Sequence, residues 1–188
     1  MAGAFSVLLS PYLVAAATAG IVVVHLTPDA SAAVEQAAVA MTFCSLIPLG
    51  FTMLLVRSGR ATDIHAAIRE QRRPIFAVAI AAAIISTVTL ENMGAHRVVV
   101  AMGWAYVASG LLFAAVNESW KISMHTGVLS GSVVVLGWVF GVKALWLALL
   151  ILLVGWSRLA RQRHTLAQAV AGAFAGGGLT ALVLMISA

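Results

Sequence analysis

The stretch 121–164 decides how this chain is organised: it begins KISMHTG (121–127), ends SRLARQRH (157–164), and is strongly apolar in between. Each end places a cation, a hydroxyl and an imidazole within a few residues of one another. The sequence between them contains two apolar segments, and two membrane crossings return a chain to the face from which it started. We therefore expect both polar clusters on one membrane face, where together they form a site for a phosphate group.

The composition of the chain is that of a membrane protein. Of its 188 residues, 62% are hydrophobic and only 9% are charged, which is far from the balance of a soluble globular domain. Apolar runs of helical length recur from end to end, and no linker or low-complexity segment divides them. We expect one integral membrane domain over residues 1–188 with an all-α fold, a polytopic bundle of six or seven transmembrane helices.

The apolar runs also predict how the chain crosses the membrane. The first run lacks a basic region before it and is longer than the apolar part of a cleaved signal peptide, so we expect a helix that Pro11 kinks or caps. If every run crosses, the loops 57–74, 117–125 and 157–164 lie on one face of the membrane. The expected helices are 4–24, 37–56, 75–90, 98–116, 125–140, 144–156 and 165–186.

The charges are distributed unevenly over this topology. Nine of the 11 Lys and Arg residues fall on the face of those three loops, leaving Arg97 and Lys143 on the other. By the positive-inside rule the basic face is cytoplasmic, which places the N-terminus inside and the C-terminus outside a prokaryotic cytoplasmic membrane. The net charge of +5 forms no basic stripe with interleaved aromatic residues, so we expect no nucleic-acid partner.

The cations of the two polar clusters are well placed to bind phosphate. Arg and Lys give charge-assisted hydrogen bonds to phosphate oxygens, and N–H groups at helix starts add partial positive charge. Lys121, Ser123 and Arg158 lie close to the starts of predicted helices, and Arg73 is a further donor. The alternative interpretation is that such residues anchor helix ends at the interface, and this second interpretation is favoured for Arg161 and Arg163.

Two histidines accompany these cations. A neutral imidazole can attack phosphorus, and an imidazolium can protonate a leaving oxygen, so His125 and His164 are expected to divide those roles. The remaining three histidines, His25, His65 and His96, have no such neighbours in the sequence and are interpreted as structural. Cys44 lies inside an apolar run and is interpreted as a core residue.

The second cluster resembles a known signature. Ser157-Arg158-x5-His164 is similar to Ser-Arg-x5-His-x3-Asp, the third signature of the type 2 phosphatidic acid phosphatase superfamily, which includes the vanadium haloperoxidases. The resemblance covers about residues 63–180. It implies a helical membrane phosphatase whose signatures meet at one site.

Two further segments match that family in the family's order. Ile122-Ser123-Met124-His125 stands where the family has Pro-Ser-Gly-His and keeps the Ser and the His. Arg73-Pro74 matches the end of the first signature, Lys-x6-Arg-Pro. All three matches lie on the same predicted membrane face.

The chain departs from the family at two positions. Ala66 stands in place of the first-signature Lys, so that this cation is lost or is replaced by Arg69 or Arg72. Gln168 stands in place of the Asp that orients the nucleophilic histidine. Because Gln168 lies one helical turn after His164, its carbonyl can accept the ring N–H and fix the tautomer, but it supplies no negative charge.

The resemblance implies a two-step phosphoryl transfer. His164 attacks phosphorus to give a phosphohistidine, His125 protonates the leaving oxygen, and water then releases phosphate. Arg73, Lys121 and Arg158, with Ser123, hold the phosphate oxygens. Neither a metal nor another cofactor is needed in this scheme.

The composition also excludes two classes of membrane enzyme. Prenyltransferases and CDP-alcohol phosphotransferases hold Mg-bound diphosphates with repeated aspartates, whereas Asp29 and Asp63 are the only aspartates here. With those classes excluded, the resemblance implies a lipid-phosphate phosphatase acting on a phosphate or diphosphate monoester, with isoprenyl diphosphate or a phosphatidic-acid-type lipid as substrate. The alternative is a bundle that binds or transports lipid phosphates without catalysis. A proton-coupled carrier is disfavoured because nearly all charges lie at predicted span ends.

Overall fold

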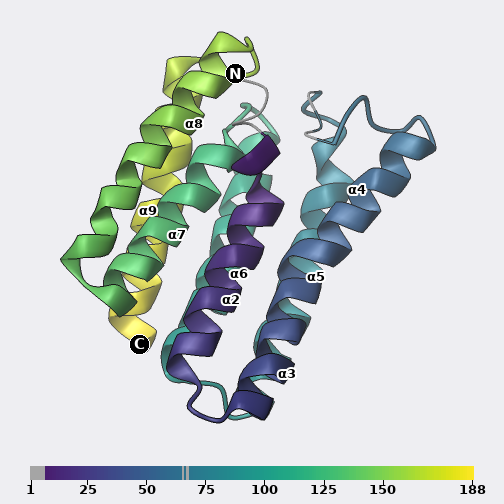
Figure 1. The fold of residues 1–188 in the computed structure, drawn as a ribbon. Coiled ribbons are helices and arrows are strands. Elements are labelled where there is room, and N and C mark those ends of the chain that lie inside the picture. The colour runs from purple at the N-terminus through teal and green to yellow at the C-terminus, as the bar shows by residue number, and fades with distance from the viewer. Residues whose placement is uncertain (1–6, 65, 67) are drawn as a thin grey trace.

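A computed structural model describes residues 7–64, 66 and 68–188, which fold into a bundle of antiparallel helices (Figure 1). No strand occurs among these residues. The expected all-α bundle is therefore confirmed. Residues 4–6 of the first expected helix lie outside the described part of the chain.

The helices of the described residues form seven continuous helical segments, called rods below, that alternate in direction. Figure 1 shows their arrangement. Helix α3, the π-helix η1 and α4 run on as one rod, and the 3₁₀-helix η2 leads directly into α8. The bounds are α2 Pro11–Leu26, α3 Ala30–Met41, η1 Thr42–Leu46, α4 Ile47–Arg57, α5 Arg72–Asn92, α6 Arg97–Asn117, α7 Met124–Phe140, η2 Val142–Ala148, α8 Leu149–Ala160 and α9 Leu166–Ser187.

Five of these rods are long and apolar enough to cross a bilayer: Ala30–Arg57, Arg72–Asn92, Arg97–Asn117, Val142–Ala160 and Leu166–Ser187. The two others, α2 and α7, are equally apolar but shorter, at 16 and 17 residues. The chain is thus an integral, multi-pass membrane protein.

Side-chain caps explain where several helices begin. Ser10 accepts a hydrogen bond from the Leu13 N–H, and Pro11 occupies the first turn, so Pro11 starts α2 and does not kink it. Asp29 accepts from the Ala32 N–H at 2.7 Å and starts α3. At α9, Thr165 and Gln168 form a reciprocal capping box.

The expected boundaries were wrong at several places. The sixth rod covers Val142–Ala160 and not 144–156, so Arg158 lies in a helix and not in the expected polar loop. Two further differences have a local cause. The second rod begins at Ala30 and not at residue 37, because Asp29 caps it and the buried Gln36 accepts a hydrogen bond from the Thr27 hydroxyl at 3.1 Å. The third rod is a full 21 residues because Arg72, expected in a polar loop, is buried in its first turn. In both cases a polar residue that was expected in a loop lies inside a helix, because its side chain has a hydrogen-bond partner there.

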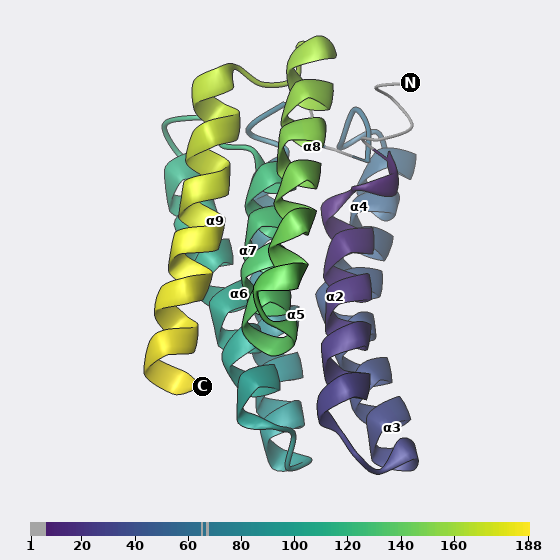
Figure 2. The ribbon, with the colours of Figure 1, turned by 60° about the vertical axis from the view of Figure 1, so that its left-hand side comes forward.

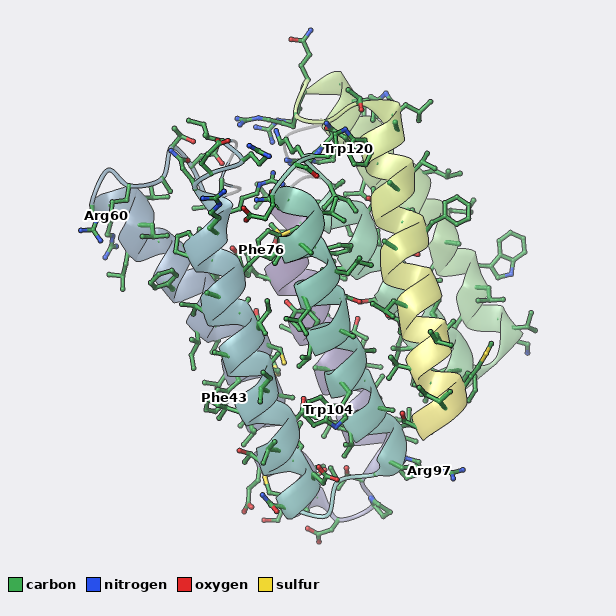
Figure 3. All side chains as sticks on the ribbon, turned by 180° about the vertical axis from the view of Figure 1, so that it is seen from behind. Phe43, Arg60, Phe76, Arg97, Trp104 and Trp120 are labelled. Carbon is green, nitrogen blue, oxygen red and sulfur yellow. The ribbon has the colours of Figure 1, made fainter. Side chains whose placement is uncertain are left out.

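The connecting segments sort to the two ends of the bundle as the crossing pattern predicts. The segments 58–64, 68–71, 118–123 and 161–165 lie at the end drawn uppermost in Figure 1, and the α2–α3 turn lies at the other end. Figure 3 shows nitrogen-bearing side chains gathered at the end that carries Arg60 and Trp120, with Arg97 at the opposite end. The nine cations predicted to share a membrane face therefore lie at one end of the bundle.

Helices α7 and α9 pack closely against each other (Figure 2). A Cβ atom added at Gly172 would clash with the Ser123 carbonyl, and one added at Gly176 would clash with the Gly127 backbone. The Thr126 hydroxyl donates to the Ala169 carbonyl at 2.8 Å across the same contact. Glycine at these positions lets the two backbones approach, and this fixes the start of α7 against the start of α9.

Candidate functional site

The polar end of the α7–α9 contact brings the two predicted histidine segments together. The Ser123 N–H donates to the Gln168 carbonyl at 3.3 Å, which joins the residue before α7 to the first turn of α9. His125 in the first turn of α7 is 4% exposed, and His164, just before α9, is 7% exposed. Both imidazoles are therefore buried at the same end of the bundle, in segments whose backbones are in direct contact.

Gln168 orients the imidazole of His164. Its side-chain Oε1 accepts a hydrogen bond from the Thr165 N–H at 3.2 Å, which identifies that atom as the oxygen. The same oxygen lies 3.1 Å from Nδ1 of His164. An oxygen with no hydrogen must accept this bond as well, so Nδ1 carries the proton. The lone pair of the ring is left on Nε2, the atom that would act as a nucleophile.

Three cations surround His164 and keep it neutral. Burial lowers the pKa of His164, and the charges of Arg72, Arg158 and Lys121 lower it further, to about 3 from its ordinary value of 6.5. A positive neighbour disfavours the imidazolium because like charges repel at short range. At neutral pH the ring is therefore an uncharged base facing a positive cluster.

Backbone carbonyls hold two of these cations in place. Arg72 donates from Nε to the Ala66 carbonyl at 2.9 Å and from Nη1 to the Ile122 carbonyl at 3.1 Å. Lys121 donates from Nζ to the Arg163 carbonyl at 2.8 Å, and burial together with its positive neighbours lowers its pKa. These bonds fix the side chains but bring no negative charge.

A tight turn at the end of α8 supports the third cation. The Arg163 N–H donates to the Arg158 carbonyl at 3.0 Å, and Gln162 lies in the left-handed region with φ of 52°. This pattern matches a Schellman motif, which ends a helix and reverses the chain. It leaves Arg158 in the last turn of α8, buried to 2% exposure, and leads the chain directly to His164.

The cluster has an excess of positive charge. Asp63 pairs with Arg163 at 2.8 Å and is the carboxylate whose charge acts on Lys121, against Arg72, Arg158 and Arg163. Four cations thus share one carboxylate among the described residues. Withdrawing a charge from water costs several kcal/mol unless opposite charge offsets it. An anion bound here would supply that charge.

Two of the predicted phosphate ligands lie outside this cluster. Arg73 has a side chain that is 59% exposed and pairs with Glu118 at 2.6 Å. Arg69 pairs with Glu70 at 3.0 Å and donates to the Glu118 carbonyl. The arginine that points inwards is Arg72. The sequence suggested it only as a replacement for the Lys that Ala66 takes the place of.

The helical spacing of α5 explains why Arg72 points into the bundle. Residues 72, 75, 76, 79 and 83 follow helical spacing, and this is the face of α5 that packs inside the bundle. Residue 73 is rotated about 100° away from that face. Continuing the apolar period of α5 backwards by one turn would have identified Arg72 from the sequence.

The remaining predicted residues have structural contacts. Ser123 is fully buried, and its hydroxyl caps α7 by accepting from the Thr126 N–H at 3.5 Å. The ring of His25 packs at a tilt against Phe140 with ring centroids 4.5 Å apart, and His96 caps α6. The prediction for His65 falls outside the described residues.

The fold and this cluster define an integral membrane helical bundle with a buried cationic site next to an oriented histidine. Within residues 7–64, 66 and 68–188, no three His, Cys, Asp or Glu side chains gather in a way that could hold a metal ion. Comparison of the chain with families of proteins, curated proteins and solved structures finds no match.

Proposed function

We propose that this protein is a membrane lipid-phosphate phosphatase that hydrolyses a phosphate or diphosphate monoester of a lipid through a phosphohistidine on His164. The observation that carries the proposal is the arrangement around that ring: Gln168 fixes the proton on Nδ1, and three cations face the neutral imidazole. A base with a free lone pair beside excess positive charge suits attack on a phosphate.

The first step forms a bond between Nε2 of His164 and phosphorus while the bond from phosphorus to the leaving oxygen breaks. Arg72, Arg158 and Lys121 neutralise the negative charge that spreads over the phosphoryl oxygens in the transition state. His125 gives a proton to the leaving oxygen, which departs as the lipid alcohol or lipid monophosphate.

The second step removes the phosphoryl group from the enzyme. Water attacks phosphorus, the phosphorus–nitrogen bond breaks, and inorganic phosphate leaves. His125 takes the proton from the attacking water, and both histidines return to their starting protonation states. Positive charge comes from the three side chains throughout, so the scheme uses no divalent cation.

Phosphate release from a panel of lipid phosphates in detergent, with EDTA present, tests this proposal. We expect release by the wild-type protein, inhibition by vanadate, and a loss of at least about a thousandfold in His164→Ala. His25→Ala, which alters a histidine at the opposite end of the bundle, should keep wild-type activity. Release that survives in His164→Ala would refute the assigned nucleophile.

A second candidate is a bundle that binds or transports lipid phosphates without catalysis. Gln168 favours it, because an amide stabilises a developing imidazolium less than a carboxylate does. This candidate predicts saturable binding of the lipid phosphate with no release of phosphate and no effect of vanadate. The same panel, read once for binding and once for release, separates the two functions.

A further inference from the structure

Arg163 is a cation of the cluster to which the proposed mechanism assigns no role. It directly precedes His164 in the chain. Its N–H donates to the Arg158 carbonyl at 3.0 Å, and its carbonyl accepts a hydrogen bond from Nζ of Lys121 at 2.8 Å. The side chain of Arg163 is 29% exposed, whereas Arg158 is buried. Arg163 therefore lies at the edge of the cluster, between the buried cations and the exterior.

The carboxylate of Asp63 holds the side chain of Arg163. Its Oδ2 lies 2.8 Å from Nη1 of Arg163, and the Asp63 side chain is also 29% exposed. The charge of the same carboxylate acts on Arg72, Lys121 and Arg158. Carboxylate and phosphate oxygens accept the same charge-assisted hydrogen bonds from these donors. Asp63 is therefore an anion that the protein itself supplies to the cluster.

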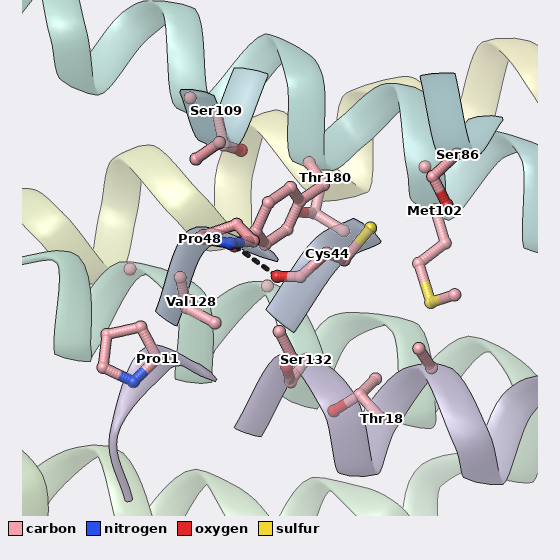
Figure 4. Close-up of a pocket in the computed structure, with 18 of the residues that line it drawn as sticks. Pro11, Thr18, Cys44, Pro48, Ser86, Met102, Ser109, Val128, Ser132 and Thr180 are labelled. Atoms are coloured by element: carbon pink, nitrogen blue, oxygen red, sulfur yellow. Dashed lines mark hydrogen bonds between the residues drawn. The ribbon is translucent and has the colours of Figure 1, made fainter. Parts of the chain in front are cut away.

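An anion from outside reaches the cluster on the side where Asp63 and Arg163 lie. The interior of the bundle contains an apolar cavity of about 120 Å³ (Figure 4). A packed layer that includes Phe76, Phe113 and Ile122 separates this cavity from the cluster. The way in for a phosphate is therefore the polar end of the bundle, where the Asp63–Arg163 ion pair is partly exposed.

The backbone around Asp63 is tied to the start of α5. The Ala66 N–H donates to the Asp63 carbonyl at 2.9 Å, and the Ala66 carbonyl accepts from Nε of Arg72 at 2.9 Å. On the other side, the N–H and the hydroxyl of Thr62 donate to Oε1 of Gln71 at 3.0 and 3.1 Å. A rotation of the Asp63 side chain to another rotamer breaks the ion pair and leaves all of these contacts in place.

A phosphate is a stronger partner for Arg163 than this carboxylate. A partly exposed ion pair is weak because water screens it. A phosphate monoester carries about 1.5–2 negative charges and three acceptor oxygens. While no phosphate is bound, Asp63 offsets part of the buried positive charge, whose withdrawal from water is otherwise costly.

We propose that Arg163 is a further phosphate-binding residue and that Asp63 competes with the phosphate for it. In the empty site Asp63 pairs with Arg163. When a lipid phosphate binds, Arg163 exchanges the carboxylate for a phosphoryl oxygen, and the ion pair re-forms as inorganic phosphate leaves. The binding of a lipid phosphate at this cluster is part of the proposed function, on which this inference rests.

Two matched variants test the competition. Asp63→Asn removes the carboxylate of the cluster, and Glu118→Gln makes the same chemical change at the exposed pair with Arg73, outside the cluster. The probe is inorganic phosphate at about pH 8, where it is mainly a dianion. Its affinity for the full protein in an uncharged detergent is measured by isothermal titration calorimetry.

We expect Asp63→Asn to bind inorganic phosphate at least tenfold more tightly than the wild type does, because the competitor is gone. Glu118→Gln should stay within twofold of the wild type, although it changes the net charge by the same amount. Should Asp63→Asn fail to fold, Asp63→Ser removes the same charge and is expected to give the same gain.

A double variant tests whether Arg163 supplies the gain. Asp63→Asn combined with Arg163→Gln should return the affinity for phosphate to within about threefold of the wild type. A gain that persists in the double variant would show that Arg163 does not bind the phosphate, and would overturn the proposal.

The proposal is also overturned if Asp63→Asn binds phosphate no more tightly than the wild type, because the ion pair then serves only to join two segments of the chain. Inorganic phosphate is not hydrolysed, so the titration is readable even in a protein that releases no phosphate from lipids. Conversely, lipid-phosphate hydrolysis with an unchanged phosphate affinity in Asp63→Asn would leave the proposed function standing and remove only the role of this pair.

Discussion

The imidazole of His164 is controlled by groups from four different parts of the chain. Gln168 in α9 fixes its tautomer, while Arg72 in α5, Arg158 in α8 and Lys121 before α7 keep it neutral. Arg72, Lys121 and Gln168 are in turn held by hydrogen bonds to backbone groups, so the ring is held by a network and not by one partner. At this scale the ring is neutral and faces positive charge, which is what the proposed nucleophile requires.

The low pKa of His164 predicts its titration. We expect the ring to stay uncharged down to about pH 4, because burial and three cations lower its pKa to about 3. The unfolded chain binds a proton near its ordinary value of 6.5, so the protein loses stability as the pH falls from 6.5 towards 3. NMR titration, with the signal assigned by its loss in His164→Gln, checks this. A midpoint near 6.5 would contradict it.

Replacing Gln168 by Glu tests the orienting contact. Glutamate can keep the capping box at the start of α9, and its charge raises the pKa of His164 because it favours the imidazolium. We expect phosphate release at neutral pH to rise about tenfold or more, since the developing positive charge gains a counterion. Gln168→Leu, which removes the acceptor, should lower release by a similar factor. Equal rates for both variants would rule out an orienting role.

Arg72 and Arg73 are adjacent in sequence but differ in their expected effects. Arg72→Met removes the donors to two buried carbonyls, which costs about 1–3 kcal/mol each, and should weaken vanadate binding more than tenfold. Arg73→Met removes an exposed ion pair worth about 0–1 kcal/mol and should leave binding within twofold. Thermal unfolding and vanadate titration measure both. If Arg73→Met weakened vanadate binding more than Arg72→Met does, Arg73 and not Arg72 would belong to the anion site.

Among the elements, the α7–α9 contact positions the site. It places the residue before α7 against the first turn of α9 through the bond from the Ser123 N–H to the Gln168 carbonyl. Small residues on both helices permit this approach. The histidine segments meet because two helices touch, although they are about forty residues apart in the chain.

A glycine pair on α9 tests this contact. Gly176→Ala drives a methyl group into the Gly127 backbone and should destabilise the protein by about 1–3 kcal/mol. Gly178→Ala, two residues later, meets no atom within 4 Å and should stabilise the helix by about 0.5–1 kcal/mol. Thermal unfolding in detergent compares them. Equal midpoints would show that the close approach is not needed.

Helix number, helix order and the shared polar end followed from apolar runs in the sequence. The Gln168 contact with His164 was also predictable, because residues four apart share a helix face. The inward turn of Arg72 was not assigned, because polar residues at a helix start were interpreted as loop. The π-helix at Cys44 and the interior cavity depend on packing between helices far apart in sequence, which no local pattern contains.

Across the whole molecule, charge and topology agree. The cationic segments lie at one end of the bundle, and the apolar helices between them match the thickness of a membrane. In the proposed function, the phosphate of the lipid binds at that end.

The orientation of the bundle can be tested with cysteines introduced at each end. By the positive-inside rule we expect Gln162→Cys on the cytoplasmic side and Lys143→Cys on the outside. An impermeant thiol reagent should label Lys143→Cys in intact cells and Gln162→Cys only after permeabilisation. The native Cys44 is buried and should stay unlabelled. The reverse labelling pattern would place the site outside.

Trapping the covalent intermediate tests the central claim most directly. The protein is incubated with a lipid phosphate labelled in the transferred phosphoryl group, quenched in alkali to preserve phosphohistidine, digested and sequenced by mass spectrometry. We predict a phosphoryl group on His164, absent from His164→Gln and unaffected by EDTA. Phosphate release without any label on His164, or a label on another residue, would contradict the account.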